Sequence, residues 1–369
     1  MAKGQRRRPD VGVLTIGGFV AVAIVLVGSQ VHHQYVVGAS TSLKTDESYV
    51  VAAAGDIACS AFPPADRAKK TFDRKLSTKD AGVPADGRPA HSCAAKGTAD
   101  LLRSLKPTAV LPLGDLQYEC GTEQDFANSY APTWGQYLPI SHPVIGNREY
   151  GRACDREDAS GYFKYFGQAA GQNQKGWYSF DLGPWHLIAL NSECSYGRGP
   201  QKVNGCATGS EQERWLKADL AAHPNLCTLA YWHEPRFSSG QHGDAIQMAD
   251  IWNDLVAARV DVVLAGHNHV YERFEPIGVT PAPPAGSRAA GAAVFQDPIL
   301  DPQGIQQFVV GTGGKNHYPF KRPPLRGESV RNDTTFGVLT LTLTSSSYEW
   351  KFVPVKGGTF QDQGKAACR

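Results

Sequence analysis

The sequence predicts an α/β domain in which buried strands alternate with helices. Four short apolar runs each end at a glycine or a histidine, as buried strands do where they run into a loop, and two helical patterns lie among them. Alternation of strands and helices is typical of a sheet covered by helices. The predicted strands span residues 49–54, 108–113, 229–232 and 261–265, and the predicted helices span Glu211–Ala222 and Ala245–Ala258.

The C-terminal region predicts a β-hairpin. Residues 337–343 (GVLTLTL) alternate between apolar and polar positions, and residues 348–355 follow as the partner strand. Residues 61–91 are polar and residues 281–301 are rich in Ala, Pro and Gly, so both segments predict loops. Neither an internal repeat nor a linker interrupts the chain between Val50 and Val355, which favours one domain, residues 40–369.

The first 39 residues predict an export segment that is not part of the fold. Basic residues from Lys3 to Arg8 precede the uncharged apolar stretch 11–28 (VGVLTIGGFVAVAIVLVG). This layout is typical of a secretory signal peptide, and the stretch also approaches the length of a membrane-spanning helix. A cleaved signal peptide and a retained anchor therefore both remain open. Either way, the domain is predicted to lie outside the cytoplasm and to touch the membrane only through this segment.

Charge and cysteine content narrow the class of protein. The formal net charge is +2, and the first 39 residues carry a surplus of three positive charges, so the remainder is near −1. No broad basic field is therefore expected to bind nucleic acid. Eight cysteines follow the apolar stretch without a CxxC pair, which favours disulfides over a zinc ribbon. Connectivity stays open, and nearest-in-chain pairing suggests Cys59–Cys93, Cys120–Cys154 and Cys194–Cys206.

Polar side chains follow the predicted strands, where open α/β sheets place their ligands. Each has an ordinary explanation, because an aspartate after a strand usually caps a turn and a lone histidine usually lies in a core. As a set, carboxylate, amide and imidazole donors from five strand ends suit two first-row metal ions better than a thiolate zinc site. The candidate ligands are Asp56, Asp115, Asn147, His233, His267 and His269.

At these residues the chain resembles the calcineurin-like metallophosphoesterases. The resemblance covers residues 48–355 and implies a four-layer α/β/β/α sandwich. Its motifs stand in the order of the family: GDIA at 55–58, GDLQY at 114–118, GNRE at 146–149, His233, and GHNHVYER at 266–273. Most members have a metal-binding histidine where this chain has Ala58. However, Tyr118 stands three residues after Asp115, where purple acid phosphatases have a phenolate ligand, so the chain looks like a small, exported enzyme of that type.

The resemblance also implies a set of ligands and a reaction. It gives Asp56, Tyr118 and His269 to the first metal, Asp115 to both metals, and Asn147, His233 and His267 to the second. A phenolate ligand favours Fe(III), and the partner would be divalent Fe, Zn or Mn. The implied reaction is hydrolysis of small phosphate monoesters by in-line attack of a metal-activated hydroxide, without a covalent enzyme intermediate. A phosphodiesterase or a nucleotide phosphoanhydride hydrolase on the same site remains an alternative.

Arg148 departs from the family, which usually has a histidine beside the asparagine ligand. Arginine can hydrogen-bond a phosphate but stays protonated near neutral pH, so it cannot donate a proton to a leaving group. The ordinary alternative is that Arg148 points outward and pairs with Glu149 or Asp155. If it points inward, His242 is the candidate proton donor, because it lies nine residues after His233 in a Gly- and Ser-rich loop.

Other classes of protein fit the sequence less well. The run GTGGK at 311–315 lacks the first glycine and the hydroxyl residue of a phosphate-binding Walker loop, and it predicts a turn at a strand end near the site. No GxSxG nucleophile motif is present, which disfavours a serine hydrolase. The alternative from another class is a non-catalytic envelope protein that keeps the fold and binds metal or phosphate.

Overall fold

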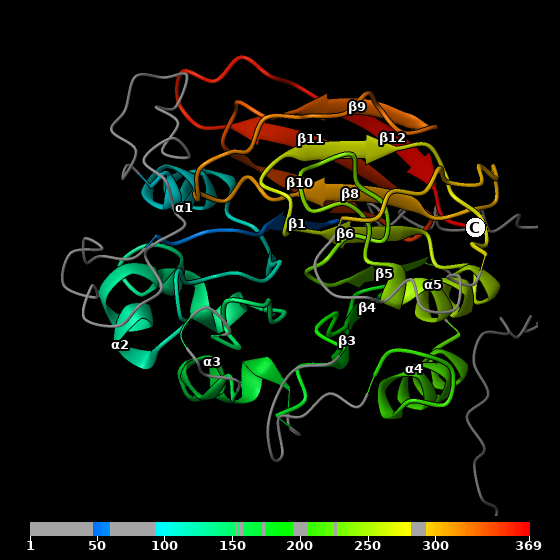
Figure 1. Cartoon of the computed structure of the whole chain (residues 1–369), viewed down its shortest axis with the longest axis horizontal. Helices are drawn as coiled ribbons and strands as arrows, with labels where there is room; N and C mark the ends of the chain where they lie inside the picture. Colours follow the sequence, from blue (N-terminus) through cyan, green and yellow to red (C-terminus); the bar gives the residue numbers. More distant parts are fainter. Residues whose placement is uncertain are drawn as a thin grey trace, which may run out of the picture. The chain divides into compact units, whose positions relative to one another are not determined.

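In the computed structural model, a five-stranded mixed sheet forms one half of the described fold (Figure 1). Its strand order is β12-β11-β10-β1-β2, in which β1 and β2 are parallel and the other neighbours are antiparallel. The strands are β1 (Tyr49–Ala54), β2 (Ala109–Pro112), β10 (Gly337–Leu343), β11 (Ser347–Pro354) and β12 (Gln363–Ala367).

A seven-stranded sheet, counted among the described residues, forms the other half. Its order is β3-β4-β5-β6-β8-β7-β9, and the central strands β4, β5, β6 and β8 run parallel. The strands are β3 (Tyr178–Leu182), β4 (Trp185–Ala189), β5 (Cys227–Tyr231), β6 (Val262–Ala265), β7 (Tyr271–Phe274), β8 (Gln306–Val310) and β9 (Glu328–Asn332). Parallel strands direct their carboxyl ends to one edge of a sheet, and there ligands are expected.

Helices cover the sheets. The α-helices are α1 (Ala95–Leu105), α2 (Glu123–Asp125), α3 (Ser160–Phe166), α4 (Glu211–Ala222) and α5 (Ala249–Ala257). The shorter helical segments are the π-helix η2 (Phe126–Tyr130) and the 3₁₀ helices η3 (Trp134–Ile140), η5 (Gly167–Ala170) and η7 (Ile246–Met248). Figure 1 shows α1 beside β1 and β10, and α4 and α5 on the opposite side of the sheets.

Alternate side chains of the central strands enter two different cores. Leu187 and Leu229 pack into the core that the seven-stranded sheet shares with the five-stranded sheet and α1. Their neighbours Ile188 and Ala230 point the other way and pack against residues of α4 and α5. Because successive residues of a strand face opposite sides, a strand buried on both faces is apolar throughout. The predicted α/β fold with a four-layer α/β/β/α arrangement is therefore confirmed.

Residues described by the structure are 47–59, 93–151, 154, 158–171, 174–194, 205–224, 227–281 and 293–369. The predicted export segment and most of both predicted loops lie outside these ranges. A search of the described helices finds none long and apolar enough to cross a membrane. Residues Thr45–Arg369 form one compact unit.

Most predicted elements agree with the structure, and the differences have local causes. The helix Glu211–Ala222 is confirmed, and its N-cap Ser210 accepts a hydrogen bond from the Glu213 amide at 3.2 Å. The helix predicted from Ala245 begins as a 3₁₀ turn, in which the Met248 amide donates to the Ala245 carbonyl three residues earlier. Residues 347–354 pair antiparallel with β10 and so confirm the predicted hairpin.

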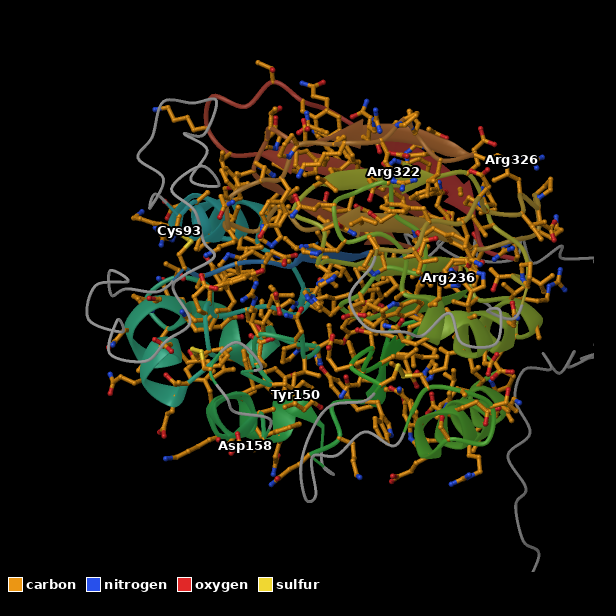
Figure 2. The ribbon with its side chains drawn as sticks, viewed as in Figure 1. Cys93, Tyr150, Asp158, Arg236, Arg322 and Arg326 are labelled. Carbon is orange, nitrogen blue, oxygen red and sulfur yellow. A yellow bond between two sulfur atoms is a disulfide. The ribbon has the colours of Figure 1, made fainter. Side chains whose placement is uncertain are left out.

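Four disulfides account for all eight cysteines. Three are the suggested pairs, including Cys59–Cys93, whose Cys93 end is labelled in Figure 2. The fourth, Cys227–Cys368, connects the first residue of β5 in one sheet to the segment after β12 in the other. Its sequence separation is 141 residues. In the chain-entropy treatment, a loop of that length corresponds to about 5 kcal/mol of stabilisation.

Candidate metal centre

The carboxyl ends of strands from both sheets meet at one place. The Gly55 amide, directly after β1, donates to the carbonyl of Val310 at the end of β8, with an N–O distance of 2.8 Å. Asp56 follows β1 and Asp115 follows β2, whereas His233 and His267 follow β5 and β6. The chain thus brings donors from two sheets to a shared edge.

The phenol of Tyr118 lies at the centre of the first group of donors. Its Oη is 2.7 Å from Asp56 Oδ1, 2.9 Å from Asp115 Oδ2 and 2.9 Å from His269 Nε2. His269 Nδ1 faces the carbonyl of Asn316 at 2.6 Å, so the Nδ1–H donates there and Nε2 keeps its lone pair for the group. All four donor atoms therefore converge on one small volume.

A second group of donors shares Asp115 with the first. His233 Nε2 lies 3.3 Å from Asp115 Oδ1 and 3.2 Å from His267 Nδ1, while His233 Nδ1 faces the Leu113 carbonyl at 2.9 Å. The buried Oδ1 of Asn147 has no hydrogen-bond partner in the described part of the chain. Asp115 therefore directs one oxygen toward each group.

The charges and the donor types fit two metal ions. Asp56 and Asp115 are almost fully buried, and buried carboxylates require compensating positive charge. Burial lowers the pKa of His233, but the attraction of Asp115 outweighs it and raises the pKa well above its usual range, which shows how strongly this position favours a positive charge. Burial, together with Asp115 and Asp56, raises the pKa of Tyr118 well above its usual value. Only a strongly polarising cation would favour the phenolate form of Tyr118. The donors that meet here, carboxylate, phenol, imidazole and amide, are all ligands of first-row metals.

The backbone at this centre adopts unusual conformations. Asp56, Asp115 and His267 have positive φ angles of 58°, 48° and 67°, a region that non-glycine residues rarely occupy. Gly146, next to Asn147, lies so close to Asp115 that a Cβ at this position would be 2.5 Å from Asp115 Oδ1. The glycine is thus required for the GNRE segment to approach the bridging carboxylate.

Glu149, which the sequence analysis named only as a motif residue and a possible partner of Arg148, ties two of the ligand segments together. Its Oε2 accepts hydrogen bonds from the amides of Gly146 and Asp115 at 2.8 and 2.9 Å. Its Oε1 accepts from the amides of Leu116 and Gln117 at 2.8 and 3.2 Å. The carboxylate is 2% exposed and points inward, so the suggested pairing of Glu149 with Arg148 is wrong.

We expect Glu149→Gln to lower the free energy of unfolding by about 2–4 kcal/mol, because an amide NH₂ cannot accept the backbone hydrogen bonds and each buried donor left unpaired costs about 1–3 kcal/mol. Urea denaturation measures the effect. Glu349→Gln is the control, since Glu349 is 54% exposed and paired only with Lys365 in the described structure. Equal stability of the two variants would contradict the proposed structural role.

Arg148 points toward the candidate centre. Its Nε is 3.7 Å from Asp115 Oδ2, its Nη1 is 3.2 Å from Glu119 Oε2, and its guanidinium lies 5.3 Å from the centre of the Tyr118 ring. The backbone amide of Arg148 also donates to Asp115 Oδ1 at 2.8 Å. The other suggested outward partner, Asp155, lies outside the described residues. An inward guanidinium here is available to phosphate oxygens.

A loop after β8 brings two further side chains that the sequence did not single out. Lys315 Nζ is 2.6 Å from Glu119 Oε1 and 4.6 Å from the centre of the Tyr118 ring. Tyr318 stacks on the imidazole of His269, with ring centres 4.2 Å apart. The GTGGK run thus forms a turn at a strand end beside the site, as predicted, and the Lys315 amide donates to the Asp56 carbonyl.

His242 lies at the same centre. Its ring centre is 4.6 Å from that of His267 and 5.5 Å from that of Tyr318, and its backbone amide donates to Asn268 Oδ1 at 2.8 Å. Burial and the nearby His269 lower the pKa of His242 to about 4. Without a bound anion, His242 is therefore a neutral imidazole at neutral pH.

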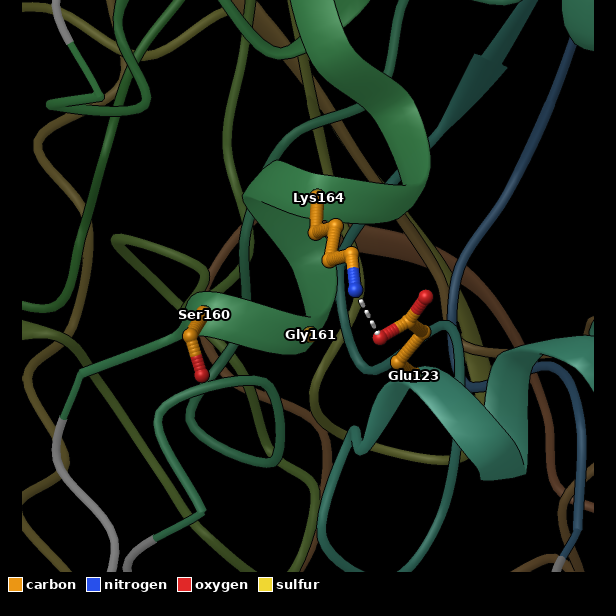
Figure 3. Close-up of a pocket in the computed structure, with 4 residues that line it drawn as sticks. All are labelled: Glu123, Ser160, Gly161 and Lys164. Atoms are coloured by element: carbon orange, nitrogen blue, oxygen red, sulfur yellow. Dashed lines mark hydrogen bonds and ion pairs between the residues drawn. The ribbon is translucent and has the colours of Figure 1, made fainter.

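Two other features of the described chain do not form a comparable centre. Asp181, His186 and His223 lie close together, but the two imidazoles stack in nearly parallel planes 4.3 Å apart, so their in-plane lone pairs do not converge on one ion. A pocket of about 280 Å³ between α2 and α3 is lined by Glu123, Ser160, Gly161 and Lys164 (Figure 3). Its Lys164–Glu123 ion pair is more than half exposed on both sides, so water solvates it.

Comparisons with known proteins point to one family. The model of the calcineurin-like phosphoesterase family matches residues 50–271, which is more than half of the chain. Acid phosphatase type 7 from Mus musculus is 27% identical over 254 residues, covering 60% of this chain and 52% of the relative. Purple acid phosphatase 21 from Arabidopsis thaliana is 34% identical over 116 residues, covering 30% of this chain and 24% of the relative. The chain thus spans about half or less of the length of these relatives.

Two solved structures share the fold. Purple acid phosphatase PPD1 from yellow lupin has a TM-score of 0.57 at 18% identity, covering 87% of this chain and 54% of that one. GAP50, described as the anchor in the inner membrane complex of Plasmodium, has a TM-score of 0.52 at 14% identity, covering 87% of this chain and 89% of that one. At these identities the likeness concerns the fold alone, so the function must be argued from the site.

Proposed function

Because the chain belongs to the calcineurin-like phosphoesterase family, we propose that it is a phosphomonoesterase of the purple acid phosphatase type with two metal ions. The position of the Tyr118 hydroxyl carries the proposal, since it lies within 2.9 Å of donor atoms of Asp56, Asp115 and His269. Relatives named acid phosphatase and purple acid phosphatase support it.

The residues would hold two ions in different surroundings. Asp56, Tyr118 and His269 would hold the first, Asn147, His233 and His267 the second, and Asp115 both. The phenol favours Fe(III) at the first position, and the second would take divalent Fe, Zn or Mn. When bound, two such ions supply Lewis acidity toward phosphoryl oxygens and an activated water for in-line attack.

The remaining side chains would bind the substrate. Arg148, next to Asp115, offers forked donors to phosphate oxygens as their charge builds up, which stabilises the transition state. His242, beside His267, is the candidate to hydrogen-bond or protonate the leaving group, and a bound phosphate would favour its protonated form. Because Arg148 cannot release a proton near neutral pH, we expect better activity on aryl esters or phosphoanhydrides than on alkyl phosphates.

We expect Arg148→His to raise kcat for alkyl phosphates more than for p-nitrophenyl phosphate, because alkoxide leaving groups depend most on proton donation. General acid catalysis typically contributes ~10²–10⁴-fold. His242→Ala should lower kcat for alkyl phosphates more than for p-nitrophenyl phosphate. Steady-state kinetics on both substrates checks this, and equal effects on the two substrate classes would show that these roles are wrong.

Hydrolysis of p-nitrophenyl phosphate by metal-loaded protein tests the proposal. We expect the metal-loaded protein to hydrolyse this ester and a metal chelator to abolish the activity. Bis(p-nitrophenyl) phosphate and ADP test the phosphodiesterase and phosphoanhydride alternatives on the same site. Binding of metal and inorganic phosphate without turnover of any of these substrates would instead favour the non-catalytic envelope protein.

We also propose that the domain acts outside the cytoplasm, either secreted or held at the membrane by its N-terminal segment. Pairing of all eight cysteines in disulfides supports this location, since such bridges persist in oxidising compartments. Fractionation of cells that express the full chain tests it, and recovery of the domain in the cytoplasm with free thiols would contradict it.

A further inference from the structure

Two cations and one carboxylate form a small network beside the candidate metal centre. Glu119 Oε1 lies 2.6 Å from Lys315 Nζ, and Glu119 Oε2 lies 3.2 Å from Arg148 Nη1. Both cations also lie over the ring of Tyr118, at 4.6 Å for Lys315 and 5.3 Å for Arg148. The network therefore sits on the phenol whose hydroxyl occupies the centre of the first ligand group.

The backbone segments that carry the two cations are anchored independently of Glu119. Arg148 donates its backbone amide to Asp115 and has its Nε 3.7 Å from Asp115 Oδ2. Lys315 donates its backbone amide to the Asp56 carbonyl, and its side chain is only 17% exposed. Removing the Glu119 carboxylate therefore leaves two positive charges, on anchored backbone segments, beside one position.

Glu119 is the most exposed member of the network. Its side chain is 42% exposed, compared with 27% for Arg148 and 17% for Lys315. Within the described part of the chain, its carboxylate makes hydrogen bonds only to these two cations. A half-exposed carboxylate held by two charge-assisted hydrogen bonds can be exchanged for another anion of similar shape.

A single guanidinium separates the position of Glu119 from the bridging carboxylate. Arg148 contacts Asp115 through Nε and Glu119 through Nη1, so the two carboxylates lie on either side of one planar group. A phosphoryl group beside Asp115 and an anion at the Glu119 position would thus contact the same guanidinium. That spacing suits a compact substrate with two anionic groups.

We propose that Lys315 and Arg148 form a subsite for a second anionic group of the substrate, a phosphate or a carboxylate, and that the Glu119 carboxylate fills this subsite until such a substrate displaces it. The inference rests on the proposed phosphatase function, since the first phosphoryl group is placed at the metal centre. In this proposal Glu119 and Lys315 both determine specificity: Lys315 favours substrates with a second anionic group, and Glu119 competes with that group.

The test compares kcat/KM for phenyl phosphate, 3-carboxyphenyl phosphate and inorganic pyrophosphate at one ionic strength. Glu119→Gln should raise the preference for the two substrates with a second anion by about tenfold relative to phenyl phosphate, and Lys315→Met should lower it by about tenfold, the scale of one charge-assisted hydrogen bond. A shift with pyrophosphate alone assigns the subsite to phosphate, and a shift with the carboxylate ester alone assigns it to carboxylate.

Matched controls come from a second lysine–glutamate ion pair, which lies between α2 and α3. Lys164 Nζ and Glu123 Oε2 are also 2.6 Å apart, but both side chains are more than half exposed at the pocket in Figure 3. Lys164→Met and Glu123→Gln should leave the substrate preference unchanged. The proposal would be overturned if the preference for substrates with a second anion were unchanged in both Lys315→Met and Glu119→Gln. A lower preference in Glu119→Gln would also overturn it.

Calorimetric binding to the metal-loaded protein separates the subsite from catalysis. Benzylphosphonate and 3-carboxybenzylphosphonate are not hydrolysed, so their affinities do not depend on turnover. We expect the ratio of their Kd values to change about tenfold in Lys315→Met and in the opposite sense in Glu119→Gln. If the Kd ratios change as expected but no ester is hydrolysed, the phosphatase function is refuted and the subsite is kept. If esters are hydrolysed but the Kd ratio changes in neither variant, the subsite alone is refuted.

Discussion

Replacing Asp115 with alanine is expected to lower kcat/KM for p-nitrophenyl phosphate by about 10³-fold or more. Removing one preorganised electrostatic group from an active site already costs about 10²–10³-fold. The loss of Asp115 should lower kcat/KM further, because its two oxygens belong to both ligand groups. They lie 2.9 Å from Tyr118 Oη and 3.3 Å from His233 Nε2. The variant should also lose metal, as elemental analysis will show.

The control for this variant is Asp100→Ala on α1. Asp100 forms an exposed ion pair with Lys96, and its removal should leave turnover unchanged. Turnover in Asp115→Ala within tenfold of the Asp100→Ala value, with both variants folded, would be incompatible with Asp115 as the bridge between two catalytic ions.

Tyr118→Phe is expected to abolish a visible charge-transfer absorption band of the oxidised, iron-loaded protein. Such a band requires a phenolate bound to Fe(III), and the substitution removes only the Tyr118 oxygen. Tyr150→Phe is the matched control, because Tyr150 is equally buried but its hydroxyl accepts a hydrogen bond from Asn191, 2.9 Å away. It should keep the band.

Two outcomes would count against Tyr118 as a ligand. One is a colourless wild-type protein with full iron occupancy, and the other is a band that survives Tyr118→Phe. Circular dichroism must show that the variant remains folded, since Tyr118 is fully buried.

Local patterns predicted β1, β2, β5, β6 and the hairpin of β10 and β11, but not the other six described strands. A buried strand that ends in Gly-Asp or Gly-His has a clear signature within a few residues, and parallel strands necessarily end at the same edge. Asn147 follows a less regular segment. Residues 143–145 make only an isolated bridge, Leu113 with Val144, although the amides of His142 and Val144 both donate to carbonyls of β2.

The roles of Glu149, Lys315 and Tyr318 could not be found in this way, although the GTGGK run that contains Lys315 was expected near the site. Glu149 acts through backbone amides of a segment 33 residues away, and Lys315 meets Glu119 across 196 residues. Neither contact leaves a periodic or motif signal in the sequence, since it depends on how distant loops pack. Ala58 likewise meets the Tyr118 segment only through the fold, in which it forms a buried bridge with Gln117.

The metal content of the purified wild-type protein tests the central claim most directly. Elemental analysis by mass spectrometry, normalised to protein concentration, should find two ions for each chain, one of them iron. Asp56, Asp115 and the unpartnered oxygen of Asn147 provide the donors for such a pair. Protein that holds no metal, or a single ion after loading with excess iron and zinc, would contradict the binuclear centre.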